Sequence, residues 1–144
     1  MNTNNIRKLR DELGLNQYEM ASKLGISRTS YSMWESNNEN YPIKQLINLC
    51  NIFNISINYI IGLTSEYNTN IKYRDIDKKL SGKRLKDLRK NLKLSQSELA
   101  NILGTSYGTL SGYERGRYLI ATPFLYDICK KYNVSADYLL GRVD

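Results

Sequence analysis

The sequence contains an internal repeat with a period of 79 residues. Residues 6–62 align without a gap with residues 85–141, and roughly 18 of the aligned pairs are identical, which indicates a duplicated domain. A chain of 144 residues has room for two domains of this size. The repeat therefore predicts two copies of one fold, over residues 1–63 and 82–144, joined by a polar linker over residues 64–81.

We expect five short helices in each copy, and so an all-α fold. Apolar residues three or four apart predict a buried face on the first helix. This face consists of Ile6, Leu9 and Leu13 in the first copy and Leu85, Leu88 and Leu92 in the second. A fourth helix carries Leu46, Leu49, Cys50 and Phe53, matched by Leu125, Ile128, Cys129 and Tyr132. A short fifth helix follows a serine cap, over residues 57–61 and 136–140.

The second and third helices of each copy are separated by a turn of three residues. The second helix begins at a capping box, formed by Asn16 with Glu19 or by Ser95 with Glu98. Glycine favours the left-handed conformation that ends a helix, and the second helix is followed by Gly25 or Gly104. A serine cap, Ser27 or Ser106, then begins a third helix that runs to about Glu35 or Glu114.

Composition narrows the class of function. The formal charge of +7 suggests a polyanionic partner, and residues 82–144 carry eleven basic and six acidic side chains against six and five in residues 1–63. The chain has no histidine, so the common zinc sites and histidine-based acid–base catalysis are excluded. We therefore expect a protein that is not an enzyme and that binds no metal or cofactor. Without a signal peptide or an apolar run of about 18 residues, a cytoplasmic protein is expected.

Four motifs give the sequence a family resemblance. They are Leu-Asn-Gln-Tyr-Glu-Met-Ala at 15–21, Leu-Ser-Gln-Ser-Glu-Leu-Ala at 94–100, Tyr-Glu-Arg-Gly at 113–116 and Asn-Val-Ser-Ala-Asp-Tyr-Leu-Leu-Gly at 133–141. Together with the two helices and their glycine turn, they resemble the Cro and phage-repressor type of helix-turn-helix domain, also called lambda-repressor-like or xenobiotic-response-element-like. The resemblance covers nearly all of the chain except the linker, and it implies a DNA-binding transcriptional regulator.

In that family the third helix enters the major groove with its first residues at base edges. The resemblance implies six base-contacting positions: Arg28, Thr29 and Met33, then Tyr107, Gly108 and Gly112. The guanidinium of Arg28 suits guanine O6 and N7, although a solvated surface charge is the alternative role. The two glycines leave two alternatives, close approach of the backbone to DNA or a second copy that mainly grips phosphates, and the second is favoured.

The resemblance also implies phosphate contacts and two structural ion pairs. The phosphate-contacting residues are Gln17, Ser30, Gln96, Thr109, Arg115 and Arg117. The ion pairs are Arg10 with Glu35 and Arg89 with Glu114. The loop Ser36-Asn37-Asn38-Glu39-Asn40 has no cation, whereas Arg115 and Arg117 flank Gly116, so the second copy is expected to hold the DNA backbone more tightly.

Two hypotheses from different classes follow. The first is a repressor-like regulator whose two non-identical helices bind a pair of unlike half-sites, with a homodimer through the fifth helices as a further option in the family. The alternative is a protein-interaction module, such as an antitoxin or antirepressor, in which one copy binds DNA and the other binds a protein partner. The near-neutral first copy is the one expected to dock that partner.

Overall fold

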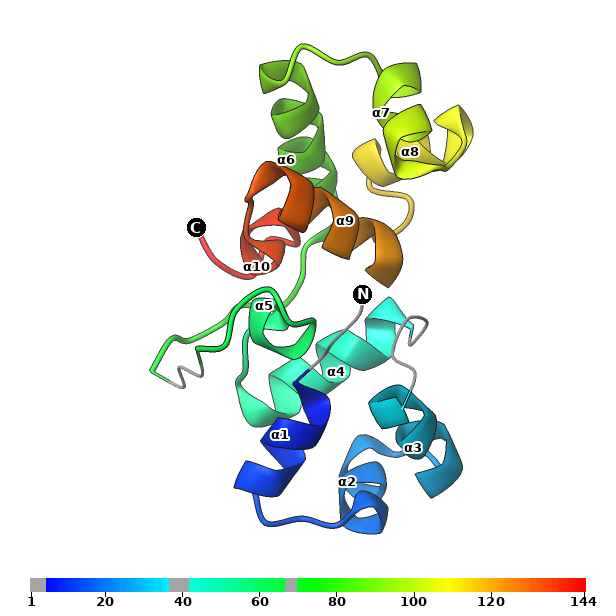
Figure 1. Cartoon of the computed structure of the whole chain (residues 1–144). Coiled ribbons are helices and arrows are strands. Elements are labelled where there is room, and N and C mark those ends of the chain that lie inside the picture. The colour runs from blue at the N-terminus through cyan, green and yellow to red at the C-terminus, as the bar shows by residue number, and fades with distance from the viewer. Residues whose placement is uncertain (1–4, 37–41, 67–69) are drawn as a thin grey trace. The chain divides into compact units, whose positions relative to one another are not determined.

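The computed structural model describes residues 5–36, 42–66 and 70–144, and within these residues it contains ten helices and no strand (Figure 1). Its contacts divide the chain into two compact units, unit 1 at Met1–Tyr73 and unit 2 at Arg74–Asp144. The expected all-α fold is therefore confirmed for the described residues.

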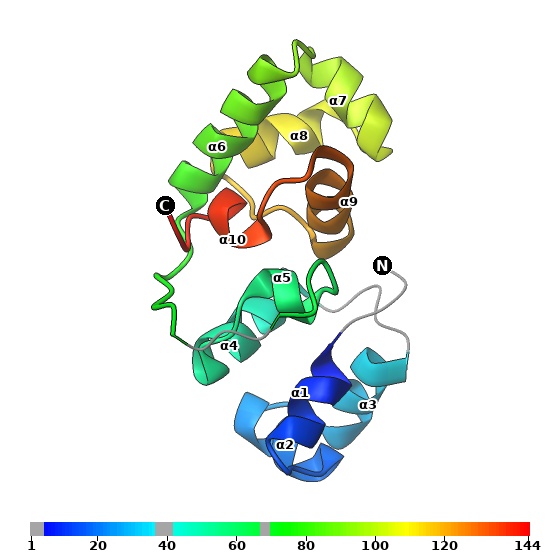
Figure 2. The ribbon, with the colours of Figure 1, turned by 60° about the vertical axis from the view of Figure 1, so that its left-hand side comes forward.

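Unit 1 contains five helices, as the repeat predicts. They are α1 (Ile6–Glu12), α2 (Gln17–Leu24), α3 (Arg28–Ser36), α4 (Ile43–Phe53) and α5 (Ile57–Ile60). Helix α3 packs against α2 and α1, and α4 packs against α2 and α5 (Figures 1 and 2). The core of the unit is aliphatic, with Ile6, Leu9, Leu46 and Leu49 fully buried.

Unit 2 repeats this arrangement. Its helices are α6 (Lys78–Asn91), α7 (Gln96–Leu103), α8 (Tyr107–Glu114), α9 (Thr122–Tyr132) and α10 (Ala136–Leu139). Helix α8 packs against α6 and α7, while α9 contacts α7 and α10 (Figures 1 and 2). Among the described residues, no helix has the length and apolar character needed to cross a membrane.

The turn between the second and third helices has the expected local chemistry in both units. The capping boxes of α2 and α7 are complete. The side chains of Asn16 and Ser95 accept hydrogen bonds from the backbone amides of Glu19 and Glu98, and the side chains of these glutamates accept hydrogen bonds from the backbone amides of Asn16 and Ser95. Gly25 and Gly104 have φ values of 69° and 74°, a conformation that is strained for residues with a Cβ. Ser27 and Ser106 accept from the amides of Ser30 and Thr109. These bonds set where α3 and α8 begin.

One part of the predicted apolar face is wrong. Leu13 and Leu92 are 38% and 36% exposed, because α1 ends at Glu12 and α6 ends at Asn91. Each leucine is the C-cap of its helix, where the chain turns away from the core. Spacing along a sequence predicts a face only as far as the helix extends.

The stretch expected to be a linker is partly folded into unit 2. The Asp77 side chain accepts from the amide of Leu80 and caps α6, which therefore begins at Lys78. Upstream, the amides of Arg74 and Asp77 donate to the carbonyls of Arg142 and Leu140. Residues 74–81 thus belong to unit 2, which starts before the expected boundary at residue 82.

Helix α6 crosses α8 at very close range. A Cβ atom on Gly82 would lie 2.5 Å from the carbonyl oxygen of Glu114 and 2.6 Å from that of Tyr113. Only a residue without a side chain allows the two backbones to approach in this way. Gly82 therefore sets the distance between α6 and the C-terminal end of α8 (Figure 2).

The two cysteines form no disulfide, both are buried, and they occupy the same position in α4 and α9. Cys50 is 0% exposed and Cys129 is 3% exposed. Burial, together with the nearby Asp137 carboxylate, raises the pKa of the Cys129 thiol to about 12. A protonated, covered thiol is a poor nucleophile.

We therefore expect native protein at pH 8 to react with a thiol reagent far more slowly than protein unfolded in denaturant, at both cysteines. Mass spectrometry of labelled peptides measures the labelling rate at each cysteine. Rapid labelling of either native thiol would contradict the assignment.

The pKa of Cys129 also predicts a pH dependence of stability. Because this pKa is higher in the folded state, the folded state binds more protons above pH 9, and stability is lost as the pH rises from about 9 to about 12.

Candidate nucleic-acid interface

In unit 1 the beginning of α3 presents exposed side chains. Arg28, Thr29 and Ser30 form its first turn and are all exposed, and Met33 is 63% exposed. Thr29 and Met33 lie four residues apart and so share one face of the helix. The opposite side holds Tyr31, which is fully buried. The three base-contacting candidates of unit 1 are therefore all exposed, and two of them share one face of α3.

In unit 2 the corresponding helix offers a different surface. Tyr107 is 56% exposed, and Gly108 lies in open space, since a Cβ there would have only the Ser106 hydroxyl near it, at 4.0 Å. Gly112 differs from the sequence-based expectation because it is buried. The ring of Tyr118 covers it, and a Cβ on Gly112 would overlap the Cδ2 and Cε2 atoms of that ring. Close approach of the Gly112 backbone to DNA is thus blocked by Tyr118.

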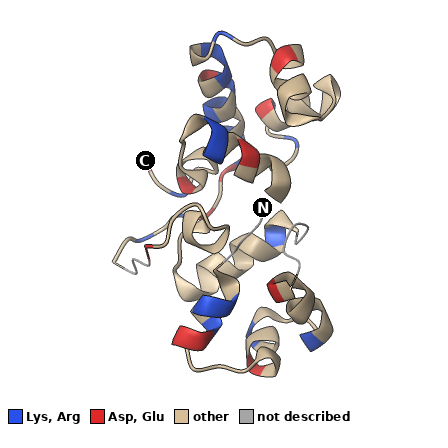
Figure 3. Ribbon diagram, in the orientation of Figure 1, with Lys and Arg blue, Asp and Glu red and all other residues tan. Residues whose placement is uncertain are grey.

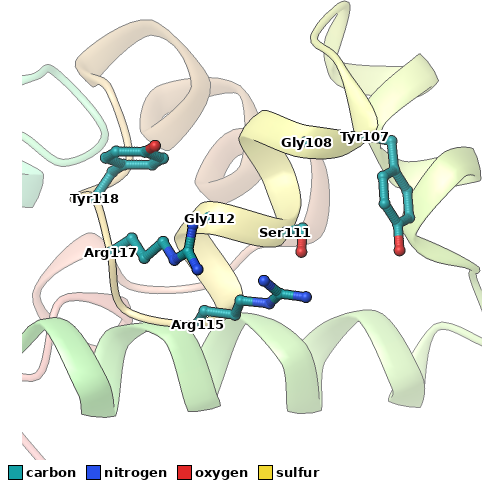
Figure 4. A pocket seen from close by; sticks show the side chains of 7 residues that line it. All are labelled: Tyr107, Gly108, Ser111, Gly112, Arg115, Arg117 and Tyr118. Carbon is teal, nitrogen blue, oxygen red and sulfur yellow. The ribbon is translucent and has the colours of Figure 1, made fainter.

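Tyr107 and Tyr118 stand at opposite ends of a hollow of about 260 Å³ along α8 (Figure 4). Between them lie Gly108, Ser111 and Gly112. The side chains of Arg115 and Arg117, from the end of α8 and the loop after it, border the hollow (Figure 4). Sequence reasoning missed Tyr118, because only the fold brings this loop residue back over Gly112.

The glutamines expected to hold phosphates donate hydrogen bonds to the glutamates of the two ion pairs. The Gln96 Nε2 atom donates to Glu114 Oε1 at 3.0 Å, and Gln17 makes the same contact with Glu35 at 3.4 Å. Each amide lies at the start of its helix, where the backbone N–H groups and the helix dipole favour an anion. The glutamate uses one donor of the amide and leaves its second N–H and its carbonyl for other partners.

The ion pairs have the same geometry in both units. Arg89 Nε donates to Glu114 Oε2 at 2.7 Å and Arg89 Nη2 donates to Oε1 at 3.0 Å, and Arg10 and Glu35 show the same two distances. Arg89 and Arg10 also donate to the backbone carbonyls of Leu94 and Leu15. The side chains are 10% and 3% exposed in unit 2. This fork fastens the end of α8 or α3 to the first helix of its unit.

The electrostatics of the two pairs follow from this geometry. The hydrogen bond to the carboxylate raises the pKa of both Arg10 and Arg89. Burial of Glu35 opposes its ionisation, but the hydrogen bonds from Arg10, together with that from Gln17, outweigh burial and hold the pKa of Glu35 below its ordinary value. Glu35 is therefore a fixed negative charge near the C-terminal end of α3.

The remaining phosphate candidates are two hydroxyl residues near the starts of α3 and α8, Ser30 and Thr109, and two arginines, Arg115 and Arg117. The hydroxyls of Ser27 and Ser106 donate to Ser30 Oγ at 3.0 Å and Thr109 Oγ1 at 2.9 Å, which leaves the latter two hydroxyl protons available. Arg115 and Arg117 are exposed. Of the loop without a cation in the first copy, residues 37–40 lie outside the described residues.

Not all of the positive charge on α6 is available to an outside partner. Several lysines and arginines are distributed along this helix (Figure 3). However, the guanidinium of Arg84 donates to the carbonyls of Tyr138 and Val143 and lies 4.1 Å from the centre of the Tyr138 ring. Arg89 is buried against Glu114, and Lys83 pairs with Asp87 at 3.5 Å. Lys86 and Lys90 remain exposed. Net charge alone therefore overstates the cations that unit 2 can offer.

Unit 2 also contains a buried ion pair that the sequence did not reveal. Arg142 Nη1 donates to Asp137 Oδ1 at 2.6 Å, and the two side chains are 0% and 4% exposed. The repeat places Leu63 and Asn58 at the corresponding positions of unit 1. The pair joins α10 to the last residues of the chain and lies outside the candidate interface.

A helix-turn-helix domain family matches the chain twice, over residues 3–66 and 82–144. Among similar proteins, the uncharacterized HTH-type transcriptional regulator YobD of Bacillus subtilis is 28% identical over 71 residues, which cover 49% of this chain and 63% of YobD. The HTH-type transcriptional regulator ImmR of the same species is 43% identical over 61 residues, 42% of this chain and 48% of ImmR. The antitoxin PezA of Streptococcus pneumoniae is 43% identical over 61 residues, 42% of this chain and 39% of PezA.

These matches span between 39% and 63% of the relatives' own lengths, so the likeness concerns a domain and not the whole of each relative. The two segments that the family matches are the two copies of the internal repeat. In each, a capped helix, a left-handed glycine and a serine-capped helix follow one another. The chain therefore belongs to the helix-turn-helix domain family and carries two tandem copies of that domain.

Proposed function

We propose that the chain is a sequence-specific, double-stranded DNA-binding transcriptional regulator of the repressor-like kind. The observation that carries the proposal is the exposed first turn of α3 and α8, with Arg28, Thr29 and Met33 on one helix and Tyr107 on the other. In helix-turn-helix proteins this turn meets base edges in the major groove. YobD and ImmR are named transcriptional regulators, which supports the same conclusion.

The two units would contribute differently to DNA binding, with unit 1 recognising bases and unit 2 mainly contacting phosphates. In unit 1, the Arg28 guanidinium suits a bidentate bond to guanine, and Thr29 and Met33 offer methyl groups to thymine. In unit 2, Arg115 and Arg117 supply phosphate contacts that position the protein without choosing among sequences. Gln17, Ser30, Gln96 and Thr109 would hold phosphates at the helix starts in both units. Unlike recognition surfaces on one chain predict an asymmetric pair of half-sites.

Selection of bound sequences from a random duplex pool with the full chain tests the proposal. A sequence-specific regulator enriches one extended site with two separate conserved segments. Recovery of unenriched sequence, with the steep salt dependence of a purely electrostatic binder, would defeat the proposal.

Arg28→Ala should relax the preference at one base pair of the unit 1 half-site and leave the other positions intact. A bidentate bond to guanine discriminates by about 1 to 3 kcal/mol, whereas binding to random duplex should change little. Dissociation constants for the preferred site, its single-base variants and random duplex, all at one salt concentration, measure the effect. A uniform loss of affinity, or none, would show that Arg28 does not contact a base.

Two controls accompany this variant. Arg7→Ala removes an exposed cation from α1, outside the first turn of α3, and should leave every base preference unchanged. Gln96→Ala should weaken all sequences about equally, because a phosphate anchor carries no sequence information. Since Gln96 also donates to Glu114, its effect on thermal unfolding is measured alongside.

A second candidate function rests on the similarity to PezA, which is named an antitoxin. In that case unit 2 binds DNA and unit 1 docks a protein partner. Footprinting of the full chain on its selected site separates the two candidates. Protection of two half-sites supports DNA binding by both units, and protection of a single half-site supports a protein-binding unit 1.

We further propose a cytoplasmic location, where the DNA target lies, and a homodimer through α5 and α10 as the family suggests. Sedimentation of the full chain, alone and on its site, measures the oligomeric state. A monomer in both conditions would remove the dimer from this proposal.

A further inference from the structure

The ring of Tyr118 takes the place of the side chain that Gly112 lacks. It lies where a Cβ of residue 112 would be, and it is itself 56% exposed. In unit 1 the corresponding position belongs to Met33, which is 63% exposed. Both units thus present a large side chain at this point of the recognition surface, but in unit 2 that side chain comes from the loop after α8.

The hollow between Tyr107 and Tyr118 is suited to an apolar edge of a base. The open space above Gly108 lets an outside group come close to the helix, and the ring of Tyr118 covers Gly112. Ser111 also lines the hollow and is 7% exposed. The rings at the two ends are aromatic, so the contact surface consists mainly of carbon (Figure 4).

The border of the hollow carries charge of the sign that DNA requires. Arg115 and Arg117 are exposed, and neither forms an ion pair with another described residue. Two guanidinium groups beside a mainly apolar hollow would hold phosphates while a base edge enters. Of the four bases, only thymine presents a methyl group in the major groove.

We propose that Tyr118, rather than Gly112, is the specificity-determining residue at this position of unit 2, and that the hollow receives the 5-methyl edge of a thymine. The inference rests on the proposed function, since it names what unit 2 recognises on DNA. Gly108 and Gly112 then have a role that a side chain would abolish. Gly108 leaves room for the base, and Gly112 leaves room for the ring of Tyr118.

The experiment uses the full chain on the site enriched from a random duplex pool. Each thymine of the unit 2 half-site is replaced in turn by uracil, which removes only the methyl group. For one thymine we expect the wild-type protein to bind about fourfold more weakly, as for the loss of one buried methyl group. Tyr118→Ala should abolish this difference at the same position, so that the two changes are not additive.

Three variants sharpen the result. Tyr118→Phe keeps the ring and should keep the thymine preference. Gly112→Ala keeps the tyrosine but pushes its ring away, and it should reduce the preference. Tyr126→Ala removes a partly exposed tyrosine of α9 that does not line the hollow, and the preference should remain.

The outcomes separate this inference from the proposed function. If the wild-type protein enriches no site, the proposed function fails. If it enriches a site but no thymine-to-uracil change in the unit 2 half-site matters, the inference alone is overturned. An equal effect of uracil on wild type and Tyr118→Ala, a uniform loss of affinity for all sequences in Tyr118→Ala, or an unchanged preference in Gly112→Ala would overturn it as well.

Discussion

Arg89→Ala is expected to lower the free energy of unfolding of unit 2 by about 3 to 5 kcal/mol, the usual effect of removing one partner of a buried ion pair. The Glu114 side chain is 3% exposed and accepts two bonds from Arg89, so the substitution leaves a desolvated carboxylate without its cation. The carbonyl of Leu94 loses its donor too. Because Glu114 also accepts a hydrogen bond from the Gln96 amide, the substitution should weaken the position of both the end of α8 and Gln96.

Denaturant unfolding of the full chain, followed by circular dichroism, measures this loss. The two units are fitted as separate transitions if their midpoints differ. Lys86→Ala is the matched control, because it removes an exposed cation from the same helix and should change stability by less than about 0.5 kcal/mol. Arg10→Ala should destabilise unit 1 in the same way as Arg89→Ala destabilises unit 2. An Arg89→Ala protein as stable as the Lys86→Ala protein would contradict the structural role.

Gly82→Ala is expected to destabilise unit 2 by about 3 kcal/mol, near the upper end of what overpacking usually costs. The added Cβ would overlap the carbonyl oxygens of Tyr113 and Glu114, which belong to the backbone of α8 and cannot rotate away. Relief requires α6 and α8 to separate, and this would also strain the Arg89–Glu114 pair between them. Thermal and denaturant unfolding measure the change.

Gly108→Ala provides the matched control, because it makes the same substitution inside a helix of the same unit. Its Cβ would have nothing closer than the Ser106 hydroxyl at 4.0 Å. Alanine stabilises a helix by up to about 1 kcal/mol relative to glycine, so the Gly108→Ala variant should be more stable than the wild type. Two glycine-to-alanine changes with opposite signs would confirm that contact, and not helix propensity, decides the result at Gly82. Equal effects would refute it.

Much of the fold was predictable because it depends on short-range chemistry that the repeat shows twice. The capping boxes at Asn16 and Ser95, and the left-handed Gly25 and Gly104, involve residues within one helical turn of each other. Local hydrogen bonds of this kind follow from residue type and spacing alone. Periodic apolar positions likewise predicted most of the cores of both units, although Leu88 is only half-buried and Leu13 and Leu92 lie beyond the ends of their helices.

The exposure of the candidate base-contacting positions was predictable in unit 1 and less so in unit 2. Arg28, Thr29 and Met33 were assigned from their places in the motif, and each is exposed as that assignment requires. In unit 2 the same alignment pointed to Gly112, which is covered by a residue six positions later. A family pattern assigns a position, but which side chain fills the space there depends on where the following loop returns.

The sequence by itself therefore determined the duplication, the helix-turn-helix order, the caps and the exposed first turn of α3, because each is encoded in residues near one another in the chain. Only the tertiary structure decided that residues 74–81 belong to unit 2, that Arg84 is occupied by internal contacts, and that Gly82 permits α6 to reach α8. It also placed Tyr118 over Gly112. The physical reason is common to all four: each depends on atoms brought together from distant segments or from a loop, whose approach no local spacing specifies.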